Sequence, residues 1–266
     1  MLLSLYIVSN KTTNPMNIAL IGYGKMGQAI ARVAAERGHR IVAIIDPKAK
    51  EASSHTLKES ALKDADVAID FSKSEGVEAA VRTCAKAGVP LVMGTTGWYD
   101  RMKKVRSLVE GTPKSGFLWS SNFSVGVQLY LKIIEAAARL FDGAGEYDIW
   151  GHELHHSGKA DSPSGTAKSL EKILLSAIRR KKSVVENKLD RKRADSEIHF
   201  SSVRGGPVNF AHTIGFDSAA DRVLITHEAR NRDGYALGAV KAAEWLAGKT
   251  GWHDMDDYLQ DVFPKS

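Results

Sequence analysis

The chain has 266 residues, of which 43% are hydrophobic and 26% charged, and its formal net charge at pH 7 is +6. This balance is typical of globular proteins and excludes the disordered and fibrous classes, while the length favours two domains over one. A single cysteine, Cys84, excludes an internal disulfide framework and favours a reducing compartment. Two basic runs, at residues 179–182 and 191–193, lack interleaved aromatic residues, so we interpret them as solvated surface and expect no nucleic-acid partner.

Residues 1–15 are expected to form an extension before the fold, with Met16 as a candidate functional start. The apolar run at residues 2–8 has neither a basic flank before it nor a cleavage site after it, so a signal peptide is not expected. Nowhere does an apolar run approach the roughly 18 consecutive residues of a membrane span. We therefore expect a cytoplasmic protein without a membrane partner.

The first predicted strand, at residues 17–21, leads directly into a G-x-G-x-x-G pattern at residues 22–27. Apolar residues at helical spacing follow, and a second apolar run ends at Asp46, 19 residues after the last glycine. The glycine pattern alone is weak, but the preceding strand, the following helix and the acidic residue together predict a dinucleotide-binding loop. An ordinary turn is the alternative. We expect a tight turn at Gly22, close approach of a pyrophosphate at Gly24, and close packing of helix on strand at Gly27.

Asp46 also bears on the choice of cofactor. A carboxylate at this position can accept hydrogen bonds from both hydroxyls of the adenosine ribose and would repel a 2′-phosphate, which favours NADH. Lys25 and Lys48 favour the opposite choice, because either could reach a 2′-phosphate. The sequence therefore predicts NADH or NADPH as the cofactor, without a preference.

The alternation of strands and helices continues through predicted strands at residues 67–71, 90–93 and 116–120. In an open parallel sheet, ligands bind outside the carboxyl ends of the strands, so the residues that end these strands are candidate cofactor contacts. Phe71 and the turn at residues 94–97 hold such positions. Simple turn formation is the alternative interpretation for both.

The pattern changes after a long predicted helix at residues 127–141. Only one further helix is clear, after Ser164, before a closing helix at residues 235–246. Strands without intervening helices favour an antiparallel or mixed sheet, and hence a separate α+β domain. We therefore predict an α/β chain with an N-terminal Rossmann-like dinucleotide-binding domain and a C-terminal α+β domain with a mixed sheet. The predicted strands of the second domain lie at residues 149–156, 197–203, 210–215 and 222–228.

Residues 153–166 carry the densest polar chemistry of the chain, with two adjacent histidines, a lysine and two carboxylates. An apolar face at helical spacing begins at Ala167, which makes Ser164 a candidate N-cap. The free N–H groups and the positive dipole end of that helix start favour an anion, and Lys159 adds a full charge. The stretch therefore predicts an anion pocket beside a titratable histidine.

Four motifs together resemble the 4-hydroxy-tetrahydrodipicolinate reductase family, formerly dihydrodipicolinate reductase, of the bacterial and plant lysine pathway. They lie at residues 22–27, 94–97, 121–126 and 153–167, and the resemblance runs from Met16 to the end of the chain. It implies that hydride from NADH or NADPH reduces a cyclic unsaturated dicarboxylate to tetrahydrodipicolinate, in diaminopimelate and lysine biosynthesis. It also implies a homotetramer.

The resemblance further implies domain boundaries and site residues. A dinucleotide-binding domain at residues 16–121, joined by residues 235–266, would close on a substrate-binding and oligomerisation domain at residues 122–234. His155 resembles the general acid and Lys159 the essential cation at a substrate carboxylate. The remaining implied substrate contacts are His156, Ser164, Gly165 and Thr166. The implied cofactor contacts are Gly22, Tyr23, Gly24, Lys25, Met26, Gly27, Asp46, Phe71, Gly94, Thr95, Thr96, Ser120 and Phe123.

Other interpretations of the polar stretch stay open. One or both adjacent histidines could merely satisfy hydrogen bonds at a strand end, and Asp161 has no assigned role. Neighbouring residues of a strand point to opposite faces and no H-E-x-x-H spacing is present, so we expect no metal. The rival functional classes are a different nicotinamide-dependent oxidoreductase and a dinucleotide-sensing protein without catalysis. A zinc site would have to draw on His152, His155, His156 and Glu153 or Asp161.

Overall fold

The computed structural model of the chain describes residues 14–112 and 115–263. The predicted extension at residues 1–15 therefore lies almost entirely outside the described residues. The chain divides into two compact units: unit 1 runs to Val125 and resumes at Asp233, and unit 2 comprises residues 126–232. Each unit has its own sheet and its own hydrophobic core.

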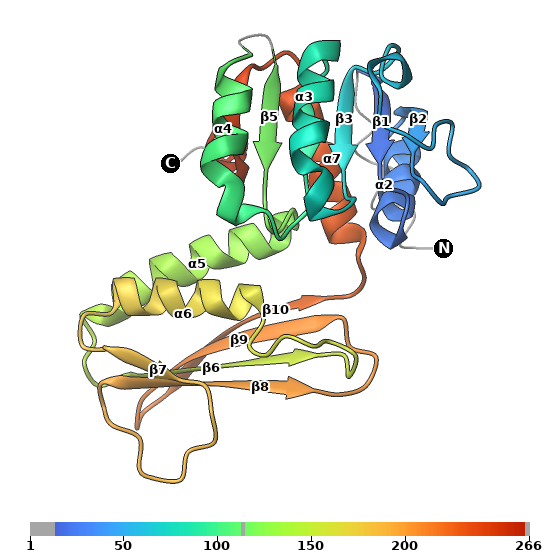
Figure 1. Ribbon diagram of the computed structural model, residues 1–266. Helices are drawn as coiled ribbons and strands as arrows, with labels where there is room; N and C mark the ends of the chain where they lie inside the picture. The colour runs from blue at the N-terminus through green and yellow to red at the C-terminus, as the bar shows by residue number, and fades with distance from the viewer. Residues whose placement is uncertain (1–13, 113–114, 264–266) are drawn as a thin grey trace. The chain divides into compact units, whose positions relative to one another are not determined.

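Unit 1 is built on a sheet of six parallel strands in the order β11-β5-β4-β3-β1-β2 (Figure 1). Its central strands are short and almost wholly buried, as expected for parallel strands covered on both faces. Because β2 pairs on one side of β1 and β3 on the other, the strand order reverses at β1, where open α/β sheets bind ligands. The strands are β1 (Asn17–Ile21), β2 (Arg40–Ile45), β3 (Val67–Asp70), β4 (Leu91–Met93), β5 (Gly116–Trp119) and β11 (Gly251–Asp254).

Helices cover both faces of this sheet, with α3 and α4 on one face and α2 and α7 on the other (Figure 1). Each helix buries an apolar stripe, which in α2 consists of Gly27, Ile30, Val33 and Ala34. The α-helices of unit 1 are α2 (Lys25–Glu36), α3 (Val77–Ala87), α4 (Met102–Glu110), α7 (Asp233–Leu246) and α8 (Met255–Val262), and the short 3₁₀ helices are η1 (Glu59–Ala61), η2 (Ser74–Gly76) and η3 (Tyr99–Arg101).

Two glycines of the G-x-G-x-x-G pattern are required by geometry, Gly22 in the loop between β1 and α2 and Gly27 in the first turn of α2. Gly22 has a φ of +90°, and a Cβ there would lie 2.6 Å from the carbonyl oxygen of Phe71. A Cβ on Gly27 would lie 2.3 Å from the carbonyl oxygen of Gly22. The tight turn predicted at Gly22 is therefore confirmed, and the close packing predicted at Gly27 is made against the turn itself.

Unit 2 is a five-stranded mixed sheet in the order β10-β9-β6-β8-β7, in which β9 is antiparallel to both neighbours and the other pairs are parallel. Helices α5 and α6 cover one face (Figure 1), where Ile134 and Leu170 pack against Phe200 and Phe216. The α/β fold with a separate mixed-sheet domain is thus confirmed. The elements are α5 (Val125–Asp142), β6 (Asp148–His155), α6 (Gly165–Ala177), β7 (Ser183–Val185), β8 (Glu197–Arg204), β9 (Phe210–Asp217) and β10 (Arg222–Ala229).

The opposite face of the unit 2 sheet carries no helix among the described residues of that unit. The indole of Trp150 lies on this face over Gly215, where a Cβ would be 2.3 Å from the ring. Leu224 is 48% exposed and Val203 is 50% exposed. This face is therefore an uncovered surface with large apolar side chains, the arrangement found at protein–protein contacts.

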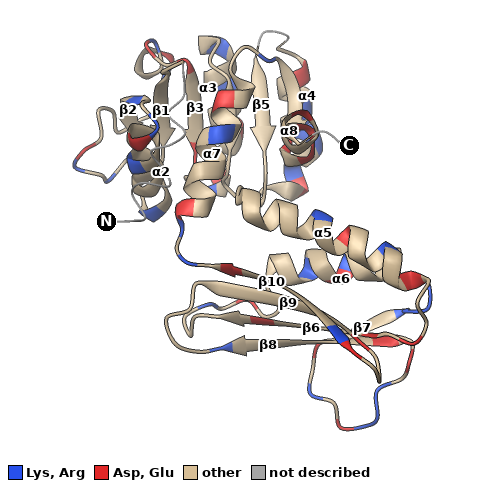
Figure 2. Cartoon of the chain, turned by 180° about the vertical axis from the view of Figure 1, so that it is seen from behind, with Lys and Arg blue, Asp and Glu red and all other residues tan. Residues whose placement is uncertain are grey.

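The two basic runs are only partly solvated surface, so that interpretation is wrong for several of their members. The Lys181 side chain is 2% exposed, and its ammonium lies 2.7 Å from Asp148 Oδ1. The Arg180 guanidinium donates to the carbonyl oxygens that follow α5, among them that of Tyr147 at 2.7 Å. Arg193 also pairs with Asp148. In Figure 2 basic residues are blue and acidic residues red. These cations fasten the loops at one end of unit 2, because buried charges require partners.

Apart from the 3₁₀ helices, four short elements of the described residues were not predicted: α4, β7, β11 and α8. Strands β7 and β11 have three and four residues, too few for a periodicity to show. Helix α8 has a capping box in which Asp254 and Asp257 satisfy each other's backbone N–H groups, a signal that the sequence contains. None of the helices in the described part of the chain has the length and apolarity needed to cross a membrane.

Candidate active site

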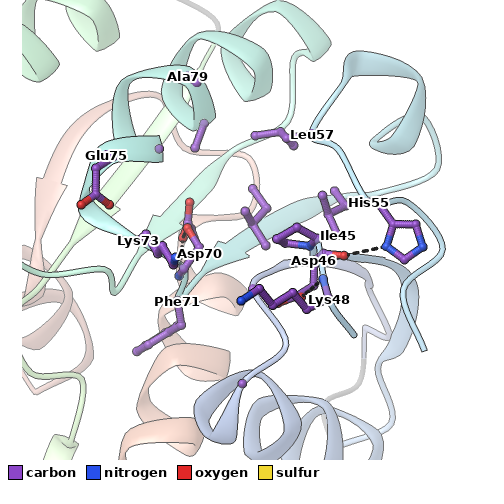
Figure 3. A pocket seen from close by; sticks show the side chains of 17 residues that line it. Ile45, Asp46, Lys48, His55, Leu57, Asp70, Phe71, Lys73, Glu75 and Ala79 are labelled. Carbon is purple, nitrogen blue, oxygen red and sulfur yellow. Dashed lines mark hydrogen bonds between the residues drawn. The ribbon is translucent and has the colours of Figure 1, made fainter. Parts of the chain in front are cut away.

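A pocket of about 520 Å³ lies in unit 1 at the carboxyl ends of β1, β2 and β3 (Figure 3). This is the point where the strand order reverses. Gly24 ends the loop as the N-cap of α2, and a Cβ there would meet no atom within 4 Å, so the helix start is open to an anion. Of the predicted cofactor residues, Gly22, Gly24, Asp46 and Phe71 line the pocket, together with Lys48, His55, Asp70, Ser72, Lys73 and others.

Both carboxylate oxygens of Asp46 are hydrogen-bonded to the backbone. Oδ2 accepts from the N–H of Tyr23 at 2.8 Å, and Oδ1 accepts from those of Lys48 at 2.8 Å and Ala49 at 2.9 Å. These amides, led by that of Tyr23, lower the pKa of Asp46. Because three donors already offset its negative charge, the carboxylate repels a 2′-phosphate less than the sequence alone indicates.

Asp70, at the end of β3, joins two loops of the pocket and was missed in the sequence. Its Oδ1 accepts hydrogen bonds from the N–H of Ser72 at 2.8 Å, from the Ser72 hydroxyl at 2.7 Å and from the Thr95 hydroxyl at 2.9 Å. The side chain is fully buried, and burial raises the pKa of Asp70. The hydroxyl of Thr95, a predicted cofactor contact, is therefore used to link the loops after β3 and β4.

Phe71 forms the side of the pocket nearest the loop after β4. A Cβ at Gly94 would lie 2.2 Å from the Phe71 ring, so only glycine admits the ring there. The ring centroid of Phe71 lies 5.9 Å from that of Phe123, which is 2% exposed. The Phe123 ring therefore supports Phe71 from the protein interior. The predicted cofactor residues that do not line this pocket are Tyr23, Lys25, Met26, Gly27, Gly94, Thr95, Thr96, Ser120 and Phe123.

In unit 2, the polar stretch is organised around the carboxylate of Glu153, which is fully buried. Its Oε2 lies 3.2 Å from Nε2 of His212. Burial opposes ionisation of this carboxyl, but its hydrogen bonds, led by that of His212, outweigh burial and hold the pKa of Glu153 well below its usual range. The donors to Oε1 are the N–H of Ser164 at 3.0 Å, the hydroxyl of Ser202 at 2.9 Å and the guanidinium of Arg204 at 2.8 Å.

His155 lies beside this carboxylate, two residues along β6. Its Nε2 is 3.3 Å from Oε2 of Glu153, and its ring stacks on Phe210 with centroids 5.7 Å apart. Burial lowers the pKa of His155 to about 4, although Glu153 acts in the opposite direction. His155 is therefore neutral at pH 7 in the free protein, and a bound anion would favour its protonated form.

Lys159 and Asp161 lie between β6 and α6 and form an ion pair, with Lys159 Nζ 2.7 Å from Asp161 Oδ1. The Lys159 side chain is 24% exposed and that of Asp161 59% exposed. The backbone oxygen of Asp161 accepts from Arg204 at 2.5 Å, which joins this loop to Glu153. The pair is thus anchored through the Asp161 backbone, with the Asp161 carboxylate exposed and the Lys159 side chain mostly covered.

The start of α6 has the geometry predicted for it. Ser164 is the N-cap and its hydroxyl accepts from the N–H of Ala167 at 3.2 Å, which confirms the predicted cap. Gly165 and Thr166 form the first turn. His155 is the buried last residue of β6, whereas His156 follows the strand and is half-buried.

Three residues of this cluster were missed in the sequence: His212, Arg204 and Ser202. Ser202 and His212 lie within predicted strands, and Arg204 directly follows one. What places these residues beside Glu153 is the strand order and register. Glu153 is the direct partner of Ser202 on β8 and of His212 on β9. Neither pairing can be read from local periodicity.

A group of side chains able to hold a metal does occur among the described residues, and it differs from the one considered in the sequence. One ligand atom each of Glu153, His155 and His212 lies within 4.8 Å of the others. The guanidinium of Arg204 lies 2.8 Å from the same carboxylate, so a divalent cation would be placed beside a fixed positive charge. We therefore interpret the cluster as one that handles protons.

Comparison with known proteins gives a consistent result. A family model for the N-terminus of dihydrodipicolinate reductase matches residues 16–123, and one for its C-terminus matches residues 126–259. The 4-hydroxy-tetrahydrodipicolinate reductase of Christiangramia forsetii is 39% identical over 93% of this chain and 99% of its own length. That of Staphylococcus aureus is 36% identical over 91% of this chain and 100% of its own length.

A solved structure of dipicolinate-bound dihydrodipicolinate reductase from Paenisporosarcina sp. TG-14 has the same fold, with a TM-score of 0.73 and 22% identity over 92% of this chain and 99% of that one. The resemblance predicted from the four motifs is thus confirmed. The two family models span most of the chain, and the relatives match it over nearly their whole length. The chain therefore belongs to the dihydrodipicolinate reductase family, a family of NAD(P)H-dependent oxidoreductases.

Proposed function

We propose that unit 1 binds the nicotinamide cofactor and that unit 2 binds the dicarboxylate and supplies the proton in the reduction of 4-hydroxy-tetrahydrodipicolinate. The observation that carries this assignment is that the Glu153 carboxylate contacts both the buried His155 and the N-cap of α6, at the two ends of the loop that carries Lys159. The relatives from Christiangramia forsetii and Staphylococcus aureus carry this reductase name. The product is tetrahydrodipicolinate, in diaminopimelate and lysine biosynthesis.

His155 is the general acid. Loss of the 4-hydroxyl group as water leaves a ring carbon conjugated with the imine. The cofactor supplies a hydride to that carbon, and the electron-rich enamine that results must take up a proton. An imidazole, with an ordinary pKa of ~6.5, suits this step, and a positioned general acid typically contributes about 10²- to 10⁴-fold. Because burial holds the pKa of His155 at about 4 without ligand, the charge of the bound dicarboxylate must raise it for the acid to be loaded.

Lys159 and the first turn of α6 hold a substrate carboxylate. The N–H groups of Gly165 and Thr166 have no partner within the helix, and the dipole end favours an anion. Without substrate, the Asp161 carboxylate pairs with the Lys159 ammonium. When the substrate binds, its carboxylate replaces that of Asp161. This exchange gives Asp161 a role that the sequence did not indicate. His156, the first residue after β6, remains the candidate for the second carboxylate.

The unit 1 pocket takes the adenosine end of either NADH or NADPH. Gly22 and Gly24 leave the backbone free to approach a pyrophosphate, and Asp46 lies where a ribose would be expected. Lys48 lines the same pocket, within reach of a 2′-phosphate. Since the charge of Asp46 is already offset by three amides, both cofactors are accommodated.

Copies of the chain associate through the uncovered face of the unit 2 sheet into a homotetramer. Leu224 and Val203 on this face are about half exposed, and Trp150 lies there as well. A face with large apolar groups is stabilised by burial against a partner. Sedimentation of the wild type and of Leu224→Lys tests this: a smaller species for the variant supports the assignment, and an unchanged species contradicts it.

The reaction is tested by following NADH or NADPH oxidation with freshly prepared 4-hydroxy-tetrahydrodipicolinate. Turnover with either cofactor is expected. A different oxidoreductase or a catalytically silent sensor would bind the cofactor but show no turnover with this substrate. Cofactor binding without turnover would therefore contradict the assignment.

A further inference from the structure

We propose that Glu153 is a positioning residue for the proton donor, fixing which nitrogen of His155 faces the substrate, and that His212 shares this carboxylate from the neighbouring strand. The inference rests on the proposed role of His155 as general acid. It assigns a task to two buried groups that neither the cofactor nor the carboxylate site requires.

The three side chains meet because of strand geometry. Glu153 and His155 lie two residues apart on β6 and therefore share a face of the sheet. His212 is the residue directly opposite Glu153 on the antiparallel strand β9. Glu153 Oε2 is consequently 3.3 Å from Nε2 of His155 and 3.2 Å from Nε2 of His212, and the two rings meet edge to face with centroids 5.3 Å apart.

The contact decides how His155 is used. Its Nε2 is buried, has no hydrogen-bond partner of good geometry, and has the Glu153 carboxylate as its nearest charged group. A carboxylate beside one ring nitrogen holds a proton on that nitrogen and stabilises the imidazolium. Nε2 thus keeps its proton throughout, and Nδ1 is the nitrogen that delivers a proton to the substrate.

Glu153 can orient a ring because it is itself immobilised. Its Oε1 accepts three hydrogen bonds, from Ser164, Ser202 and Arg204, at 2.8–3.0 Å. The Ser164 bond comes from the N-cap of α6, the helix whose first turn is proposed to bind the substrate carboxylate. One buried carboxylate therefore holds the acid and the anion-binding turn in a fixed relationship.

The groups around His155 make opposite contributions to its protonation. Glu153 favours the protonated form, whereas burial, His212, Lys159 and Arg204 oppose it. His227 lies one strand further, stacked on Phe210 with centroids 5.6 Å apart. Removing the negative charge of Glu153 should therefore lower the pKa of His155, and removing His212 should raise it.

The test measures kcat against pH for wild type, Glu153→Gln and His212→Gln at saturating substrate. Because the protonated acid is the active form, kcat falls as the pH rises past the pKa of His155 in the complex. In Glu153→Gln we expect kcat to drop at least tenfold at pH 7 and the fall to move about one pH unit lower, with the KM for cofactor unchanged. In His212→Gln the fall should move to higher pH. An isosteric change that acted only on structure would not move the two profiles in opposite directions.

Glu244→Gln is the matched control. Glu244 also pairs with an arginine and a histidine, at 2.7 Å from Arg37 and 2.7 Å from His39, but in unit 1. Its pH profile should coincide with that of the wild type. Profiles that stay unmoved in both cluster variants, or that move the same way, overturn the proposal.

Dipicolinate affinity against pH provides a readout that does not depend on turnover. Dipicolinate binding is expected to weaken with rising pH. Relative to the wild type, this weakening should begin at lower pH in Glu153→Gln and at higher pH in His212→Gln. Absence of turnover in the wild type would refute the proposed function alone, whereas unshifted affinity curves would refute the positioning role. His212→Gln leaves the carboxylate in place, so it carries the test if Glu153→Gln does not fold.

Discussion

The ammonium of Lys159 lies 2.7 Å from the carboxylate of Asp161, two residues further along the same loop. The chain thus supplies its own carboxylate to the cation proposed to hold the substrate carboxylate. The carboxyl group is 59% exposed and its pKa is lowered, first of all by the hydrogen bond from Lys159. In the proposed assignment, substrate binding displaces this ion pair.

Asp161→Asn should tighten dicarboxylate binding, because it removes this competitor. An exposed ion pair is worth about 0.2–1 kcal/mol, so we expect the Kd for dipicolinate to fall by about 1.4- to 5-fold. Calorimetric titration measures the change. A weaker affinity would show that Asp161 supports Lys159 and does not compete for it.

Lys159→Ala should raise the KM for the dicarboxylate by at least tenfold and lower kcat/KM correspondingly, because a charged hydrogen bond to substrate is lost. Lys168→Ala is the control: Lys168 lies on α6 and pairs with Glu171 and Glu186. Its kinetics should match those of the wild type. A wild-type rate of Lys159→Ala at low substrate concentration would contradict the assigned role.

His155→Gln should lower kcat at least tenfold with little change in the Kd for NADH, since the proton donor is lost while the cofactor pocket of unit 1 is untouched. His152→Gln serves as control, because His152 lies on the same strand but on the other face, stacked beside Trp150. Steady-state kinetics and cofactor fluorescence provide the two measurements. Equal turnover of both variants would exclude His155 as the acid.

Dipicolinate binding should take up protons near pH 7. His155 is neutral in the free protein, with its pKa lowered to about 4, and the bound dicarboxylate raises that pKa. Affinity should consequently fall as the pH rises through the pKa of the complex. Calorimetry in two buffers of different ionisation enthalpy counts the protons, and His155→Gln should abolish the uptake. Buffer-independent enthalpies for the wild type would contradict this linkage.

Lys48→Ala should raise the KM for NADPH more than that for NADH, by up to about fivefold, the range of an exposed ion pair. Lys48 lines the unit 1 pocket, whereas Lys50, two residues on, does not. Lys50→Ala is thus the matched control and should leave the ratio of the two KM values unchanged. Equal effects of Lys48→Ala on both cofactors would remove Lys48 from the 2′-phosphate site.

Much of the fold could be predicted because its signals are local. The turn at Gly22, the strand ending at Asp46 and the cap at Ser164 each depend on a few neighbouring residues. The short strands β7 and β11 could not be predicted, since three or four residues give no periodicity. Each is positioned by pairing with a neighbouring strand.

The site divides in the same way. The sequence alone is enough to identify the glycine loop and to show that His155 and Lys159 precede a helix start. The three-dimensional structure was needed to show that His212 faces Glu153, that backbone amides donate hydrogen bonds to Asp46, and that Lys181 is buried against Asp148. The physical reason is that strand register and burial arise from contacts between residues far apart in the chain, which no local pattern encodes.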